Sequence, residues 1–295
     1  MPEWKGKTRG GSLGYRIFIA LIKHCGLKAA YALLLFVVPY FVPFAPKGTK
    51  ASWWYWRHIH HKSRLKAMLM VLKHYYRFGQ IIIDKMAAPS GYEKNFKYDF
   101  NNYDQFLDIL NSGKGVVMIG AHFGHWALGG QFFGDYSKKI NIVMYDAEYQ
   151  KIKAQVEELT GGRNYKVIPV NEDEMATIFN IKAALDNGEY VCFQGDRYIN
   201  DNKVLQHDLM GHSAKFPAGP FLIASRMHLP VVFYFSEKED TLRYSFNFFF
   251  AEAPKRNAEK KQEMQLLDQY ISVLEQRMKI HPEQWFNFYQ FWQKE

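Results

Sequence analysis

A histidine, an aspartate and an arginine follow two short apolar runs of the chain. His122 comes after GVVMIG, and Asp196 with Arg197 comes after YVCFQ. A histidine in such a position can act as a general base towards a hydroxyl or an amine, because its ordinary pKa lies near working pH. Arginine offers a planar fork of N–H donors to a phosphate or to a developing oxyanion. The other interpretations are a hydrogen-bonded structural histidine and a surface Asp–Arg ion pair.

Alternating strands and helices are needed to bring these residues to one place. From residue 100 onwards, short apolar runs alternate with segments of helical character, which predicts an α/β fold with a mixed, largely parallel sheet flanked by helices. In open sheets of this kind, sites form at the carboxyl ends of strands. The expected strands are 115–120, 141–145, 165–170, 190–194, 231–235 and 244–250, and the expected helices are 126–133, 147–159, 172–185, 221–227 and 257–280.

Four sequence blocks occur in the order AHFGHW, GDR, FPAGP and HPEQWFNFYQFW. In this order and at these separations they resemble the lipid A biosynthesis (lauroyl/myristoyl-type) acyltransferase branch of the lysophospholipid acyltransferase superfamily, over nearly the whole chain. The resemblance implies a membrane-bound enzyme that moves an acyl chain from a thioester to a hydroxyl of a lipid or glycolipid acceptor. The donor would be acyl carrier protein or coenzyme A, and no other cofactor is implied.

The first motif of that family is a histidine, four intervening residues and a carboxylate. Five helical steps end about 140° from the starting face, so the histidine must lie in the turn before the helix, with the acid facing back towards it. Gly120 and Gly124 allow such a turn. The acid would hold the imidazole tautomer and stabilise the imidazolium, as in a serine-protease triad. Here His122 is in place, but the expected acid position is Ala127.

Three explanations of Ala127 are open at this point. An acid from elsewhere in the chain replaces it, with Asp196 as the leading candidate; activity has been lost naturally; or the residue was substituted deliberately to trap a complex. Loss of the orienting acid of a triad costs on the order of 10⁴ in rate. A carboxylate within hydrogen-bond reach of His122 would therefore favour catalysis, and its absence would favour an impaired form.

Further residues are expected to contact the substrates. Lys215 and the turn at Gly219-Pro220 lead into an expected helix, and a helix start with a cation nearby suits an anionic acceptor or the donor's phosphopantetheine. His125 is interpreted as structural, with a second proton-accepting group as the alternative. The residues predicted to bind substrate are Gly124, His125, Lys215, Phe216, Pro217, Gly219 and Pro220.

The first 83 residues carry a strong positive charge. Fourteen Lys and Arg and one acid, Glu3, give this region a net charge of +13, whereas residues 84–295 carry −4. A basic nucleic-acid-binding protein is disfavoured, because no recognition motif accompanies the charge. The basic region suits anionic lipid head groups, at about 1 kcal/mol per residue near the surface, and an acidic carrier protein. Two cysteines, Cys25 and Cys192, exclude a disulfide scaffold.

The same region contains an uncharged run of eighteen residues from Ala29 to Pro46. As a helix it would reach about 27 Å, close to the roughly 30 Å hydrocarbon core of a bilayer. Pro39, Pro43 and Pro46 are expected to break or kink its second half, which favours a short anchor or re-entrant segment over a regular span. A buried helix of a soluble core is the alternative.

An aromatic cluster, WWYW at 53–56, follows the apolar run and is typical of the membrane–water interface. Core packing is the alternative for some of its members. His58, His60 and His61 come next, but no carboxylate or cysteine lies near them in the sequence to complete a ligand set. We therefore expect no metal site.

These patterns divide the chain into a basic membrane-associating region, 1–83, and an α/β acyltransferase domain, 84–295. The main hypothesis is an acyltransferase at the bacterial inner membrane, with its catalytic domain on the cytoplasmic side, in which His122 deprotonates the acceptor and Arg197 stabilises the oxyanion. The expected partners are the lipid acceptor, the anionic membrane surface and acyl carrier protein, without nucleic acid. The alternative is a catalytically impaired relative that binds lipid or acyl carrier protein.

Overall fold

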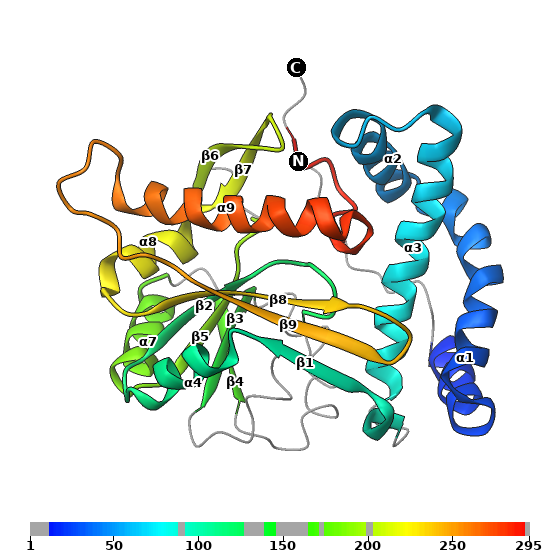
Figure 1. The fold of residues 1–295 in the computed structure, drawn as a ribbon, viewed down its shortest axis with the longest axis horizontal. Helices are drawn as coiled ribbons and strands as arrows, with labels where there is room; N and C mark the ends of the chain where they lie inside the picture. The colour runs from blue at the N-terminus through cyan, green and yellow to red at the C-terminus, as the bar shows by residue number, and fades with distance from the viewer. Residues whose placement is uncertain are drawn as a thin grey trace.

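A seven-stranded sheet forms the centre of the protein (Figure 1). The computed structural model describes residues 12–87, 92–126, 139–145, 165–170, 174–198 and 203–292. In these residues the strand order is β1-β9-β8-β2-β5-β3-β4, and every neighbouring pair is parallel except β8 with β9. The strands are β1 (Lys97–Asn101), β2 (Val116–Gly120), β3 (Ile140–Tyr145), β4 (Tyr165–Val170), β5 (Tyr190–Gln194), β8 (Val231–Lys238) and β9 (Arg243–Phe250).

Both faces of the sheet are covered, because its central strands are apolar on both sides. Val117 and Ile119 of β2 belong to one core cluster, and Val116 and Met118 belong to another on the opposite face. All five residues of β2 are buried. A strand buried on both faces shows a continuous apolar run instead of alternation, and this is the pattern of the sequence VVMIG.

Helices lie on the two faces of the sheet. Tyr270 of α9 packs edge-on against Phe233 of β8 at 5.5 Å between ring centroids, and α7 and α8 contribute to the same cluster. On the other face, Phe106 of α4 stacks on Phe248 of β9 at 4.0 Å. The helices are α4 (Tyr103–Asn111), α7 (Glu174–Asp186), α8 (Ala218–Met227) and α9 (Gln262–Ile280).

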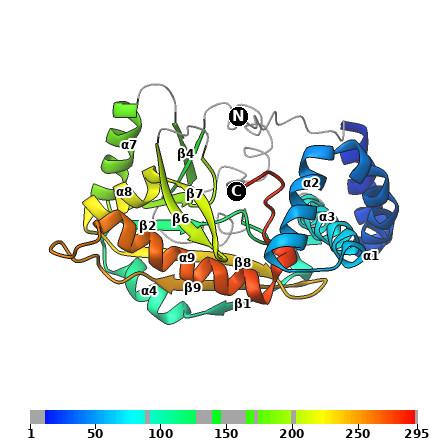
Figure 2. The same cartoon turned by 90° about the horizontal axis from the view of Figure 1, so that it is seen from above.

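A separate antiparallel hairpin and two short helical turns complete the part of the chain from residue 92 onwards. The hairpin pairs β6 (Val204–Leu209) with β7 (His212–Pro217). The turns are η2 (Tyr92–Asn95), before β1, and η5 (Pro282–Gln284), after α9. Figure 1 and Figure 2 show the hairpin beside α9.

The N-terminal helices stand together at one end of the molecule, opposite α7 (Figures 1 and 2). They are α1 (Ser12–Phe44), α2 (Pro46–Trp54), the π-helical turn η1 (Tyr55–Ile59) and α3 (Arg64–Ala87). Within α1, Ile17–Phe44 is long and apolar enough to cross a membrane, by length and composition. Its most apolar window is only 28% buried, so this helix is unlike the core helix of a soluble domain and indicates membrane association.

The expected kink lies elsewhere in α1. Pro39 and Pro43 are inside the helix, and the residue with non-helical geometry is Gly26, at φ 78° and ψ 173°. Glycine adopts positive φ without the steric cost that other residues meet. The helix does end at Phe44, and Pro46 begins α2, where a proline loses no helical hydrogen bond. The break expected near Pro46 is therefore present, while Pro39 and Pro43 lie inside the helix without interrupting it.

A buried ion pair joins the N-terminal helices to the sheet. Lys238 of β8 donates to Asp84 of α3 at 2.7 Å, and neither side chain is more than 1% exposed. The hydroxyls of Tyr31 and Tyr244 also donate to Asp84. Removing one partner of such a pair leaves an unpaired buried charge and typically costs about 3–5 kcal/mol. This cluster fixes α1 and α3 against β8 and β9.

Most of the expected elements are confirmed within a few residues. The structure also contains elements that were not predicted, among them the helices α3 and α4, the strand β1 and the β6–β7 hairpin. The residues of β1 alternate between exposed and half-buried, and β6 has only one buried residue. Both strands contain charged side chains and lack the continuous apolar run of a buried strand. The helices expected at 126–133 and 147–159 lie outside the described residues, apart from Trp126.

Candidate active site

The strand register brings His122 and Asp196 together. β2 and β5 are parallel neighbours with Gly120 opposite Gln194, and His122 and Asp196 each follow two residues later. The backbone N–H of Gly195 donates to the Gly120 carbonyl at 2.8 Å, so the pairing continues past the strand ends. The two side chains meet at the carboxyl edge of the sheet, where open α/β sheets form their sites.

His122 and Asp196 share two hydrogen bonds. The Nδ1 atom of His122 lies 2.8 Å from Oδ1 of Asp196, and the backbone N–H of His122 donates to Oδ2 at 2.9 Å. Because a carboxylate only accepts, Nδ1 carries the proton of this pair, and Nε2 is the basic nitrogen of the neutral ring. His122 is 7% exposed and Asp196 is 1% exposed, so the pair is shielded from water.

Asp196 is held as a charged carboxylate. The indole N–H of Trp285 donates to Oδ2 at 3.1 Å. Burial alone would raise the pKa of the Asp196 carboxyl, but the charge and hydrogen bonds of His122, together with the charge of Arg197, outweigh burial and lower the pKa below its usual value. The carboxylate can therefore orient the imidazole and stabilise an imidazolium.

The segment 282–292, which we call the tail segment, holds both loops of this pair. The backbone N–H of Phe286 donates to the carbonyl of His122 at 2.8 Å. The hydroxyl of Tyr289 donates to the carbonyl of Asp196 at 3.0 Å. The loops after β2 and β5 are thus fixed to each other and to a third segment that comes much later in the chain.

The turn after His122 requires a glycine at position 124. Gly124 has φ +54°, and a Cβ atom there would lie 1.8 Å from the carbonyl oxygen of Ser236. The next residue, His125, donates its backbone N–H to the same carbonyl at 2.9 Å. The turn therefore packs directly on the backbone of β8, which fixes the direction in which His122 leaves the sheet.

Comparison with known proteins shows the family of this chain. The sequence profile of the bacterial lipid A biosynthesis acyltransferase family matches residues 61–294, which include the His122–Asp196 pair and the tail segment. The chain belongs to this family. The matched region covers the whole sheet and α3, and it begins after α1, α2 and η1.

One curated relative is more distant. The phosphatidylinositol mannoside acyltransferase of Mycolicibacterium smegmatis (strain ATCC 700084 / mc(2)155) is 23% identical over 130 residues. The match covers 43% of this chain and 41% of that protein. The chain thus matches less than half the length of this relative, which nevertheless shares the acyltransferase description of the family.

Arg197, the third residue predicted for the acyltransferase reaction, contacts the tail segment. Its Nη2 donates to the carbonyl of Phe286 at 3.0 Å, and its Nε is buried without a hydrogen-bond partner among the described residues. A buried cationic donor with no partner favours an anionic group nearby. The oxyanion role of Arg197 stays a prediction.

The side chain of His125, in the turn after β2, is buried, and its environment favours a structural role. It is 2% exposed, and its ring contacts that of Tyr244 edge-on at 5.6 Å. Burial, followed by the positive charge of Lys85, lowers the pKa of His125 well below its usual value. The ring is therefore neutral at physiological pH. Its contact with substrate stays a prediction.

The block expected to bind substrate spans the end of the hairpin and the start of a helix. Its members are Lys215, Phe216 and Pro217 in β7, and Gly219 and Pro220 in the first turn of α8. Phe216 is fully buried and packs against Phe291, which in turn packs against Trp285 at 5.2 Å. Through these rings the block supports the tail segment, and its binding role stays a prediction.

Two residues of the tail segment contact Asp196 but were not singled out from the sequence. They are Trp285 and Tyr289, although the block HPEQWFNFYQFW contains both. The available signal was chemical, because indole and phenol groups in a buried aromatic segment need hydrogen-bond partners. Those partners are the side chain and the carbonyl of Asp196. Ala127, the expected acid position, lies outside the described residues.

Proposed function

We propose that this protein is a membrane-associated acyltransferase in which His122 and Asp196 act as a catalytic pair. The observation that supports this most directly is the 2.8 Å contact between Nδ1 of His122 and Oδ1 of Asp196. In this proposal Asp196 supplies the orienting acid that the family motif places at position 127. Of the three explanations of Ala127, the replacement by another acid is the one we adopt.

In the proposed reaction, Nε2 of His122 takes the proton of an acceptor hydroxyl as its oxygen attacks the thioester carbonyl carbon. Asp196 stabilises the resulting imidazolium, and Arg197 faces the oxyanion of the tetrahedral intermediate. The C–S bond then breaks, and the imidazolium returns its proton to the departing thiolate. The acyl group ends as an ester on the acceptor, and His122 ends neutral.

The acceptor we propose is a lipid or glycolipid, with acyl carrier protein or coenzyme A as the donor. The description of the mycobacterial relative, which names a phosphatidylinositol mannoside, supports a glycolipid acceptor. The apolar helix α1 and the basic region 1–83 support a location at the bacterial inner membrane, with the sheet on the cytoplasmic side. We retain 1–83 and 84–295 as the proposed division of the chain, although α3 crosses it.

The test measures transfer of a labelled acyl chain to a membrane lipid extract, from acyl carrier protein as the donor and, separately, from coenzyme A. We expect the full chain to transfer the label and His122→Ala to abolish transfer. Asp196→Asn, which keeps the shape but loses the charge, should lower the rate on the order of 10⁴-fold. Ala127→Glu should add little, because Nδ1 of His122 is already bound by Asp196.

A matched control is Asp268→Asn. Asp268 also accepts from a histidine, His207, at 2.9 Å, but this pair is partly exposed and belongs to β6 and α9. Asp268→Asn should leave the rate of acyl transfer within about twofold of that of the unmodified chain. Full activity of Asp196→Asn would overturn the assignment of the catalytic pair. Lipid binding without transfer from either donor would support the impaired relative instead.

A further inference from the structure

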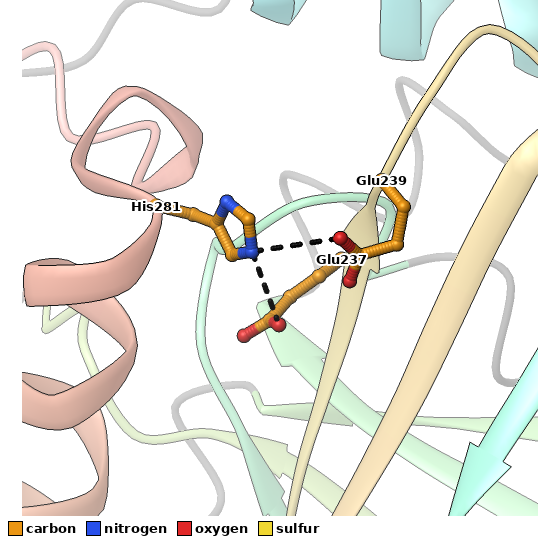
Figure 3. Close-up of side chains that lie close together, drawn as sticks. All are labelled: Glu237, Glu239 and His281. Carbon is orange, nitrogen blue, oxygen red and sulfur yellow. Dashed lines mark ion pairs between the residues drawn. The ribbon is translucent and has the colours of Figure 1, made fainter.

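Two glutamates and a histidine that are far apart in the sequence converge beside the end of α9 (Figure 3). Glu237 lies in β8 and Glu239 directly after it, while His281 directly follows α9. Nε2 of His281 lies 3.8 Å from Oε2 of Glu237 and 3.8 Å from Oε2 of Glu239. One ligand atom from each of the three side chains lies within 4.8 Å of the others.

Neighbouring side chains donate hydrogen bonds to one oxygen of Glu237 and to one oxygen of Glu239. Oε1 of Glu239 accepts from the hydroxyl of Ser245 at 2.5 Å. Oε2 of Glu237 accepts from Asn247 at 3.2 Å and from Arg277 at 3.4 Å. Such outer hydrogen bonds orient carboxylates that bind metal ions.

The second oxygen of Glu237 has no such partner. The Glu237 side chain is 2% exposed, and its Oε1 is buried without a hydrogen-bond partner among the described residues. A buried carboxylate oxygen left in this way is costly. A cation or a water molecule at this point would remove the cost, and the carboxylate lies beside the imidazole of His281 and the carboxylate of Glu239 (Figure 3).

We propose that Glu237, Glu239 and His281 bind a divalent transition-metal ion, for which Zn²⁺ is the suitable probe. One imidazole nitrogen and two carboxylate oxygens are ligands that Zn²⁺ accepts at about 2.0–2.2 Å, which gives about 3.4 Å between ligands of a tetrahedron. The two 3.8 Å separations from His281 must therefore shorten by a few tenths of an ångström, and the two carboxylates, whose ligand atoms lie within 4.8 Å of each other, by about 1.4 Å at most. Water would take the fourth position.

The charge balance sets the expected strength of this site. Arg277 already offsets part of the charge of Glu237, so binding should be weaker than in a closed site of four protein ligands. The position at the carboxyl end of α9 is favourable, because the helix dipole there attracts cations. An ion bound here would tie β8 to the start of the tail segment, which carries Trp285.

The experiment uses the full chain without an affinity tag, treated with a chelator and then titrated with Zn²⁺. We expect one ion to bind by isothermal titration calorimetry and the Tm to rise by a few degrees at saturation. Co²⁺ added in place of Zn²⁺ should give visible absorption bands that differ from those of the hydrated ion in buffer. Glu239→Gln and His281→Ala should lose both signals.

His207→Ala is the matched control, because His207 also pairs with a carboxylate and its side chain is 26% exposed, against 23% for His281. It should retain binding. Circular dichroism must show that each variant is folded. If His281→Ala does not fold, Glu239→Gln, which is the milder change, serves as the test variant. The proposal is overturned if the unmodified chain binds no Zn²⁺, or if folded Glu239→Gln binds it as well as the unmodified chain.

Discussion

At the scale of single residues, Asp196 is the centre of the candidate site. It accepts hydrogen bonds from the ring and backbone of His122 and from the indole of Trp285. Three donors on one buried carboxylate keep it charged and fix its orientation. Trp285 is thus a positioning residue in the proposed reaction, since it acts on the histidine through Asp196.

Trp285→Phe removes the indole N–H and keeps an aromatic ring in place. A hydrogen bond to a charged group contributes about 1.5–3 kcal/mol, so we expect kcat to fall about tenfold or more while KM changes little. Steady-state acyl-transfer kinetics would measure this split.

Trp292→Phe is the control for that change. Its indole also makes a buried hydrogen bond, to the carbonyl of Leu209 at 2.9 Å, so it should lose comparable stability without the loss in kcat. Equal losses of kcat in the two variants would show that Trp285 acts only through general packing.

The residue types of the site were predictable from the sequence, and their partners were only partly so. His122 and Asp196 follow apolar strands, so the rule for open α/β sheets located them. Their adjacency depends on β2 and β5 being neighbours, although β3 and β4 lie between them in the sequence. Trp285 joins them from a segment whose position no local pattern specifies. The proximity of Glu237, Glu239 and His281 was not predicted for the same reason.

At the scale of elements, the turn after β2 is the part of the site with the least steric tolerance. Gly124 combines positive φ with a close approach to the Ser236 carbonyl. Gly211, in the β6–β7 turn, shares the first property at φ +80°, but a Cβ atom added there would meet open space. A comparison of substitutions at the two glycines therefore distinguishes the cost of positive φ from the cost of a steric clash.

Gly124→Ala should both destabilise the fold and abolish acyl transfer, because the backbone of the turn must move away from β8. Gly211→Ala should cost only the strain of positive φ, about 1–2 kcal/mol, with activity retained. Urea unfolding and transfer assays on both variants measure these effects. A Gly124→Ala variant with normal activity would show that the turn is not needed to place His122.

A helix-to-tail contact gives a second element-scale expectation. His74 of α3 is fully buried; its Nε2–H donates to the Trp285 carbonyl at 2.9 Å, and its Nδ1 accepts from the Ser52 hydroxyl at 2.9 Å. Burial is the main reason that the pKa of His74 is lowered to about 4. The neutral ring fits this pair of contacts, because one nitrogen donates and the other accepts.

Acidification should therefore destabilise the protein through His74. Above pH about 6.5 the ring is neutral in both the folded and unfolded chains, so it adds no pH dependence. As pH falls from there towards 4, only the unfolded chain takes up the proton, and the free energy of unfolding falls by up to about 3 kcal/mol. Chemical denaturation at a series of pH values would measure the loss, and His74→Gln should reduce it. An unchanged slope in His74→Gln would exclude His74 as its source.

At the scale of the whole molecule, apolar side chains are exposed at the end formed by the N-terminal helices. Phe36 and Tyr40 of α1 are 77% and 71% exposed, and Leu65 of α3 is 73% exposed. Tyr55 and Trp56, in contrast, are buried in the core, so the alternative of core packing holds for these two members of the aromatic cluster. Exposed apolar side chains beside basic residues are typical of membrane contact.

Phe36→Glu should weaken binding to vesicles that contain anionic lipid, because it places a negative charge in the apolar face. Phe179→Glu is the control, since Phe179 is 63% exposed on α7 at the opposite end of the molecule. Vesicle co-sedimentation at fixed lipid concentration compares the two. If both variants bind like the unmodified chain, the face formed by α1 does not contact the membrane.

The tail segment, which completes the candidate site, is the last part of that site to be synthesised. His122 and Asp196 emerge from the ribosome well before Trp285 and Tyr289, which hold Asp196 in place. A nascent chain that has not reached residue 289 thus has both residues of the proposed catalytic pair but lacks the hydrogen bonds from Trp285 and Tyr289 that hold Asp196. In the proposed reaction, an incomplete chain would therefore be a poor catalyst until the tail segment has been synthesised.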